Sequence, residues 1–117
     1  MSLAPERFSA RGRALVEDTE NVLYLSAASA WEIAIKHALG KLRLPQPPAA
    51  YVPSRMSALG IIPLSVEHAH ALHVMTLPAH HRDPFDRVIV AQAQLEALGV
   101  LTSDPALRAY DVEIISA

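Results

Sequence analysis

Three acidic sites lie where helices are expected to begin. Glu32 follows Ser29 at the spacing of a capping box, and Asp83 and Asp86 occupy the cap and first turn of another helix. Asp104 is expected to cap a third, short helix. Carboxylates that converge repel one another unless a divalent cation neutralises them, and Mg²⁺ or Mn²⁺ suits such oxygen ligands. A metal held in this way activates water and stabilises charge on a phosphodiester, so these residue types indicate metal-dependent hydrolysis.

Short apolar runs that alternate with helical segments should position these carboxylates. The expected strands are 22–25, 61–64, 100–102 and 112–115, and the expected helices are 9–18, 29–39, 49–59, 66–75, 84–98 and 105–109. This alternation predicts an α/β fold with a mainly parallel sheet, formed by a single domain over residues 1–117. Glu32 and Asp104 both follow a strand closely, and ligands bind beyond the carboxyl ends of parallel strands.

Helix capping alone also explains acidic residues at these places. Aspartate and serine at a helix start satisfy free backbone N–H groups, and negative charge there complements the helix dipole whatever the function. Glu32 has a second ordinary role open to it, because Lys36 lies one helical turn further on and can pair with it. On spacing alone, capping and metal binding both remain open.

The composition limits the classes of function. The chain has 117 residues, 51% of them hydrophobic, and no cysteine, so it can bury a core but has no disulfide or cysteine-based zinc site. Ten Lys+Arg against twelve Asp+Glu give a net charge of −2, so any nucleic-acid role must rest on local charge or a bound metal. Scattered glycines exclude a phosphate loop and weaken a flavodoxin-type small-ligand alternative. Without a secretory signal or membrane-spanning stretch, we expect a cytoplasmic protein.

Six histidines raise a zinc alternative. His70 and His73 can share a helical face with His68 nearby, but the spacing fixes no third ligand, which disfavours zinc. His80 and His81 are expected in a loop, where they would form hydrogen bonds.

Three segments around the carboxylates carry a more specific pattern. They are S-A-A-S-A-W-E-I-A-I-K at 26–36 with L-G-K-L at 39–42, H-H-R-D-P-F-D-R-V-I-V-A-Q-A at 80–93, and L-T-S-D-P at 101–105. In that order they resemble the second, third and fourth acidic motifs of PIN-domain proteins, with compatible spacings from about Pro5 to the end. The closest resemblance is to the VapC toxins of bacterial type II toxin–antitoxin systems.

The resemblance implies a three-layer α/β/α fold and a metal-dependent endoribonuclease, with Mg²⁺ or Mn²⁺ directing water at an RNA phosphodiester. Carried over position by position, it makes Glu32, Asp86 and Asp104 the catalytic and metal-binding residues. The auxiliary candidates are Asp83, Ser103, Arg82 and Arg87. Of these, Asp83 is better explained as a cap, and the two arginines either contact phosphate or form ordinary surface pairs.

The same resemblance implies protein partners besides RNA. A VapB-like antitoxin would hold the toxin, and a homodimer or higher oligomer is expected. The leucines Leu39, Leu42 and Leu44, beside a proline-rich loop, are a candidate partner surface, and a place in the core is the alternative for them.

One element of the family pattern has no counterpart in this sequence. Family members begin with a central strand that ends in an aspartate, whereas residues 5–11 already match the helix that follows it. With three carboxylates instead of four, we expect an N-terminally truncated domain with reduced metal affinity and nuclease activity. The alternative is a non-catalytic PIN remnant that dimerises or binds antitoxin.

Overall fold

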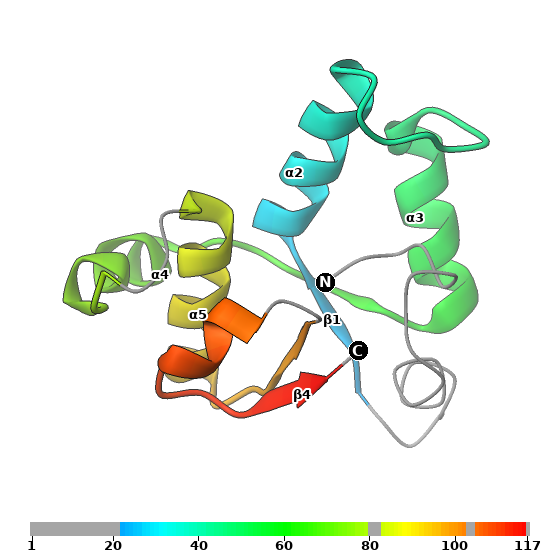
Figure 1. Ribbon diagram of the computed structural model, residues 1–117. Coiled ribbons are helices and arrows are strands. Elements are labelled where there is room, and N and C mark those ends of the chain that lie inside the picture. Colours follow the sequence, from blue (N-terminus) through cyan, green and yellow to red (C-terminus); the bar gives the residue numbers. More distant parts are fainter. Residues whose placement is uncertain (1–21, 80–82, 103–104, 117) are drawn as a thin grey trace.

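The computed structural model describes residues 22–79, 83–102 and 105–116. The elements in chain order are β1 (Tyr24–Ser26), α2 (Ala27–Ala38), α3 (Pro48–Leu59), β2 (Ile62–Leu64), α4 (His68–His73), the 3₁₀ helix η2 (Val74–Thr76), α5 (Pro84–Glu96), β3 (Val100–Thr102), the 3₁₀ helix η3 (Pro105–Ala109) and β4 (Ile114–Ser116) (Figure 1). Strands and helices alternate as predicted, and the helix expected over 9–18 lies outside the described residues.

The described strands form two small parallel sheets. β1 pairs with β2, with Tyr24 opposite Ile62, and β3 pairs with β4, with Val100 opposite Ile114. The expected parallel α/β class is confirmed, but these strands are divided between two sheets. The expectation of an absent first strand concerns the chain before residue 22, outside the described residues.

Helix α2 begins one turn earlier than predicted. Ser26 is its cap, and the Ser26 Oγ accepts a hydrogen bond from the Ala28 N–H at 3.1 Å. Ser29 is therefore an internal, buried residue, and the predicted capping box with Glu32 is wrong. Ser26 ends strand β1, and its extended backbone suits a cap residue, whereas Ser29 lies inside the helix. The helix ends as predicted, with Gly40 at a positive φ of 72°.

Helix α5 begins where the sequence predicts and ends earlier. The Asp83 carboxylate accepts hydrogen bonds from the N–H groups of Phe85 and Asp86, at 2.9 and 3.3 Å, and Pro84 occupies the first turn. The helix closes at Ala97, which adopts the left-handed conformation with φ of 54°, and not at Gly99.

Two hydrophobic clusters hold these elements together. The larger one packs α5 against β3 and η3, and the smaller one packs α3 against β1. Their buried members are Leu77, Val90, Ala91, Ala93, Val100, Leu107 and Tyr110 in the first, and Leu25, Val52 and Ile61 in the second.

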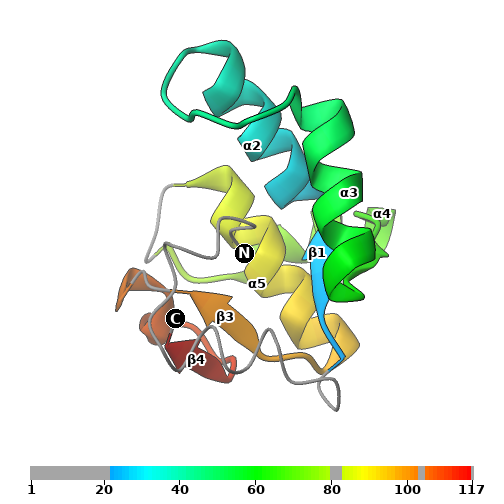
Figure 2. The same ribbon diagram turned by 90° about the vertical axis from the view of Figure 1, so that its right-hand side faces the viewer.

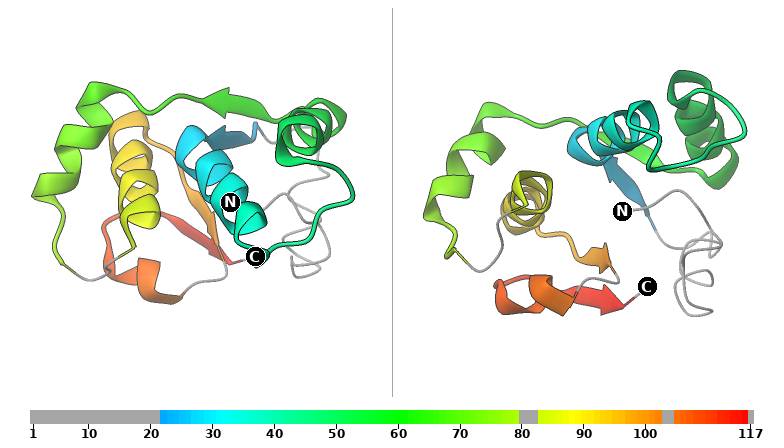
Figure 3. Two further views of the ribbon diagram at one scale, coloured as in Figure 1. Left: turned by 90° about the horizontal axis from the view of Figure 1, so that it is seen from above. Right: turned by 45° about the horizontal axis from the view of Figure 1, so that its top comes forward.

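Helix α5 lies between α4 and α2 and packs on both (Figures 1 and 3). It contributes to the larger cluster and packs on α2, whose Ala30 and Ile33 border the smaller cluster. Within the described ranges, no helix has the length and apolar character needed to cross a membrane.

Candidate functional site

Glu32 lies in the second turn of α2 and is largely covered. Its side chain is 22% exposed, and its Oε2 lies 3.1 Å from the Nζ of Lys36, one turn further on. The predicted pairing with Lys36 is confirmed. Lys36 is 53% exposed, so this is a surface ion pair of the kind that contributes little to stability.

Asp86 lies in the first turn of α5 and is half-buried. Its backbone N–H is held by Asp83, whose carboxylate is engaged with two N–H groups at the helix start. Asp83 therefore acts as the cap that the sequence predicted, and it fixes the backbone that carries Asp86.

An aromatic contact brings the helices of Glu32 and Asp86 together. Trp31 precedes Glu32, Phe85 precedes Asp86, and the two rings meet edge to face with centroids 5.2 Å apart. Helices α2 and α5 pack on each other around this contact (Figure 2). Two carboxylates that are far apart in the sequence are thus carried by neighbouring turns of adjoining helices.

The donor chemistry of this pair suits a hard divalent cation, since both side chains offer carboxylate oxygens. Asp104, the third expected ligand, lies outside the described residues, as do Ser103, Arg82, His80 and His81. Over the described ranges, no group of three His, Asp or Glu side chains is close enough to hold a metal ion. The roles of Glu32 and Asp86 as metal ligands stay predictions.

Arg87 is engaged with the backbone of the segment that precedes α5. Its guanidinium donates hydrogen bonds to the backbone carbonyls of Val74, Leu77 and Pro78, at 3.2, 3.4 and 2.9 Å, and to the hydroxyl of Tyr110 at 3.3 Å. It thereby holds the end of η2 and the following loop against α5. This buttress was not among the roles predicted for Arg87, which were phosphate contact or a surface ion pair, and those roles stay predictions.

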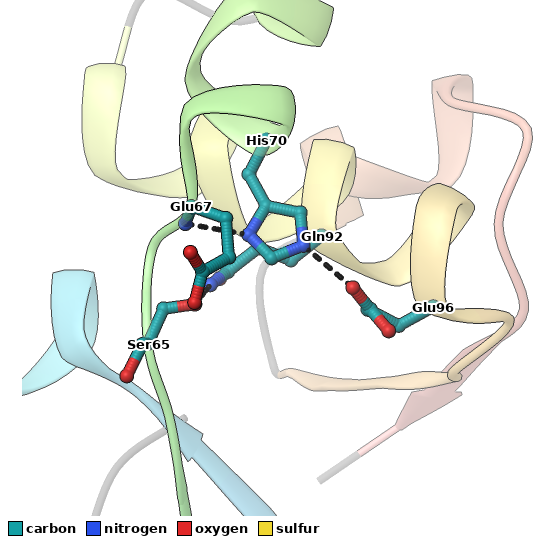
Figure 4. Close-up of polar contacts among 5 residues, drawn as sticks. All are labelled: Ser65, Glu67, His70, Gln92 and Glu96. Carbon is teal, nitrogen blue, oxygen red and sulfur yellow. Dashed lines mark hydrogen bonds and ion pairs between the residues drawn. The ribbon is translucent and has the colours of Figure 1, made fainter.

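Two histidines of α4, His70 and His73, fasten that helix to α5. His70 is buried, its Nδ1 accepts the backbone N–H of Glu67 at 2.9 Å, and its Nε2 lies 2.8 Å from the Glu96 Oε1 (Figure 4). Because Nδ1 accepts, the proton is on Nε2, which donates to Glu96. His73 makes a similar contact with Gln94 at 2.7 Å. Both ring nitrogens of His70 are engaged in this way, which speaks against the zinc alternative.

Gln92 is a polar residue of the interior that the sequence analysis did not single out. It is 1% exposed, its Nε2 donates to the Ser65 carbonyl at 3.2 Å, and its Oε1 has no hydrogen-bond partner within the described part of the chain (Figure 4). It lines a cavity of about 210 Å³ between β1 and β3, with Tyr24 and Leu101 on the two sides. A glutamine inside the apolar run V-I-V-A-Q-A was the signal that could have found it.

Comparison with known proteins shows which family this chain belongs to. Residues 3–113 match the PIN domain, so the chain belongs to the PIN domain family, and the resemblance is confirmed. Along 61 residues the chain is 61% identical to Ribonuclease VapC16 of Mycobacterium tuberculosis (strain ATCC 25618 / H37Rv). That match covers 52% of this chain and spans 43% of the relative's length.

Proposed function

We propose that this chain is a metal-dependent ribonuclease of the VapC type, which hydrolyses RNA phosphodiesters. The observation that carries the proposal is the contact between Trp31 and Phe85, because it sets Glu32 and Asp86 on adjoining helices of a PIN domain. Similarity to a protein named as a ribonuclease supports the choice of RNA as substrate.

Glu32, Asp86 and Asp104 would hold Mg²⁺ or Mn²⁺, which when bound supplies an activated water and stabilises charge on the phosphate. Asp83 supports the site by capping α5, since its carboxylate fixes the backbone N–H of Asp86. Ser103 and Arg82 are auxiliary candidates that adjoin Asp104 and Asp83 in the sequence.

The same proposal covers the domain organisation of the chain, its location in the cell and its protein partners. Residues 1–117 form one domain of three α/β/α layers, which works in the cytoplasm and pairs with a VapB-like antitoxin and with a second copy of the chain. Of the leucines expected to meet a partner, Leu39 is 63% exposed, whereas Leu42 and Leu44 are partly buried. Leu72 and Met75, at 71% and 85% exposure, add apolar surface on α4 and η2.

An RNA cleavage assay with and without Mn²⁺ tests the proposal. We expect metal-dependent cleavage that Asp86→Asn lowers by about 100-fold or more, because loss of a charged ligand weakens the hold on the metal, and removing one preorganised electrostatic group from an active site costs about that much. Glu32→Gln should act in the same direction, and both variants should weaken Mn²⁺ binding in a titration.

Asp111→Asn is the matched control, since Asp111 is an exposed aspartate beyond η3 whose backbone carbonyl accepts from Gln94, about two turns further along α5 than Asp86. It should retain cleavage. Cleavage that survives Asp86→Asn, or that does not need a divalent metal, contradicts the proposal. Absence of Mn²⁺ binding at millimolar metal would favour the alternative of a non-catalytic module, to which the exposed Leu72 and Met75 are suited.

A further inference from the structure

Strand β1 has one hydrogen-bonding edge that no strand covers among the described residues. Within those ranges β1 pairs with β2 alone, and no backbone hydrogen bond joins β1 to β3. Alternate residues of a strand direct their backbone groups to opposite edges. The Leu23 carbonyl accepts the Ile62 N–H at 2.8 Å, so the backbone groups of Tyr24, the next residue, point away from β2.

Strand β3 has a similar free edge, and it faces the same cavity. The Val100 N–H donates to the Glu113 carbonyl at 2.8 Å, so the backbone groups of Leu101 point away from β4. Tyr24 and Leu101 are both half-buried and line the cavity of about 210 Å³ between the strands. Buried backbone groups are nearly always paired, and voids larger than a water molecule are few in protein interiors. Two free strand edges on one cavity therefore indicate a place for a hydrogen-bonding occupant.

Gln92 of α5 provides an independent sign of such an occupant. It is 1% exposed, and its Nε2 donates to the Ser65 carbonyl at 3.2 Å (Figure 4). Its Oε1, in the wall of the cavity, accepts no hydrogen bond from the described part of the chain. A buried acceptor without a donor costs free energy, and such groups are rare in native structures. The occupant that the cavity suits therefore brings an N–H or O–H donor.

We propose that the cavity binds an extended segment of a partner protein, which lies as a strand between β1 and β3 and donates a hydrogen bond to Gln92. An extended backbone carries N–H and C=O groups on both of its edges, so one segment serves the free edges of both strands. Addition of a strand to an open sheet edge is a general mode of peptide recognition. The bound segment joins the two small sheets into one.

The lining of the cavity defines the side chains of that segment. Most of the walls are apolar, with Leu64, Ile89 and Ile115 among them. Glu113 is the one charged residue among the described residues that line the cavity. A segment with apolar side chains and a basic residue at one end fits this lining, whereas a phosphate-bearing ligand finds no counter-charge in it.

A segment from another protein fits the free edges better than a strand from a second copy of this chain. Each described strand is already paired, so a second copy must break one of its own pairs to supply one. A partner segment that is disordered when free has to pay only the entropy of becoming ordered. The inference requires neither metal nor RNA and is independent of the proposed function.

A peptide titration into the full chain tests the proposal. The probe is a capped, fluorescently labelled peptide of alternating valine and leucine with a lysine at each end, and its binding is followed by anisotropy. The matched probe carries methyl groups on its valine nitrogens, which removes backbone donors and keeps the apolar side chains. We expect saturable one-to-one binding that methylation weakens by at least about 10-fold, since several hydrogen bonds are lost. Equal binding of the two probes, or none, overturns the proposal.

Amide hydrogen exchange locates the bound peptide. The Tyr24 and Leu101 amides should exchange about 100-fold more slowly at a peptide concentration 100 times the dissociation constant, because only the free protein then exchanges. The Leu25 and Val100 amides, which lie on the edges already paired with β2 and β4, should change much less. Protection of Tyr24 without Leu101, or the reverse, contradicts insertion between the strands.

A pair of glutamine variants tests the hydrogen bond to the side chain. Gln92→Leu should raise the dissociation constant of the unmethylated peptide by roughly 2- to 12-fold, the range for one hydrogen bond. Gln94→Leu is the matched control on the same helix, because the Gln94 amide contacts His73 and the Asp111 carbonyl and does not line the cavity. It should leave the affinity unchanged. Unchanged or tighter binding by Gln92→Leu contradicts the assigned donor.

The exchange data on the chain without peptide exclude the other occupants. Slow exchange of both Tyr24 and Leu101 in dilute protein assigns the cavity to residues 1–21 and overturns the proposal. Protection of these amides that increases with protein concentration assigns it to a second copy, with the same consequence. Fast exchange of both amides in the free chain, and their protection by the peptide, is the result that we expect.

Discussion

The half of the molecule around α5 (residues 68–116) and the half around α2 (residues 22–64) differ in what their side chains do. Among the described residues, seven buried hydrophobic side chains form the α5 core, against three in the α2 core. The α5 half also holds Arg87 on backbone carbonyls and His70 on Glu96. The α2 half instead exposes Trp31, Leu39 and its basic residues.

This difference indicates a division of labour. The α5 half is a support whose polar groups bind one another, although Leu72 and Met75 of α4 and η2 are exposed, and the α2 half exposes Trp31, Leu39 and its basic residues. The candidate site takes one carboxylate from each, Asp86 from the support and Glu32 from the open side. Preorganised catalytic groups need such a rigid support, whereas ligand contacts need accessible side chains.

The largest effect on stability should come from the two cores. Leu107 and Leu25 are both 2% exposed, one in each cluster, so they form a matched pair. Leu107→Ala and Leu25→Ala should each lower the free energy of unfolding by about 2–5 kcal/mol, with Leu107→Ala the more costly because its larger cluster collapses less around the cavity. Urea denaturation measures both, and an equal or reversed order would contradict the division between the halves.

A middle-sized effect is expected at Arg87. Arg87→Gln should lower the free energy of unfolding by about 1–2 kcal/mol, because hydrogen bonds to a charged group contribute roughly 1.5–3 kcal/mol and water replaces part of the loss. Faster amide exchange over residues 74–78 should accompany it. Arg43→Gln, at an exposed site of the open half, should change stability by less than about 0.5 kcal/mol. Similar values for the two arginines would show that Arg87 is no buttress.

The smallest stability effect should come from Glu32. Its pair with Lys36 is an i,i+4 contact whose lysine is 53% exposed, so Glu32→Gln should cost no more than about 0.5 kcal/mol. Thermal unfolding of Glu32→Gln, Lys36→Ala and the double variant measures this coupling. A much larger loss would make Glu32 a structural residue and weaken its place in the metal site.

Much of the fold could be predicted from local sequence signals. The strand 100–102, the short helix 105–109 and the start of α5 at Asp83-Pro84 agree with the structure, because capping residues, prolines and apolar runs act over a few residues. The start of α2 could not be predicted in the same way. Ser26 and Ser29 are both competent caps, and the end of the strand selected the first.

The acidic residues of the candidate site could be predicted from the sequence, but the side chains that hold the neighbouring elements in place could not. Glu32 and Asp86 were named from the sequence, and their roles stay predictions. The functions of Arg87, His70 and Gln92 could not be predicted, because each depends on a partner 10 to 27 residues away, such as Leu77, Glu96 or Ser65. Such contacts leave no periodicity in the sequence.

The sequence by itself determined the parallel α/β class, the end of α2 before Gly40, the start of α5 at Asp83, and the family. These features depend on local chemistry and on recognisable motifs. Only the tertiary structure decided that Trp31 meets Phe85, that Glu32 and Asp86 lie on adjoining helices, and that the α2 side remains open. The physical reason is that burial and long-range pairing depend on which surfaces pack together, and local preference does not specify that choice.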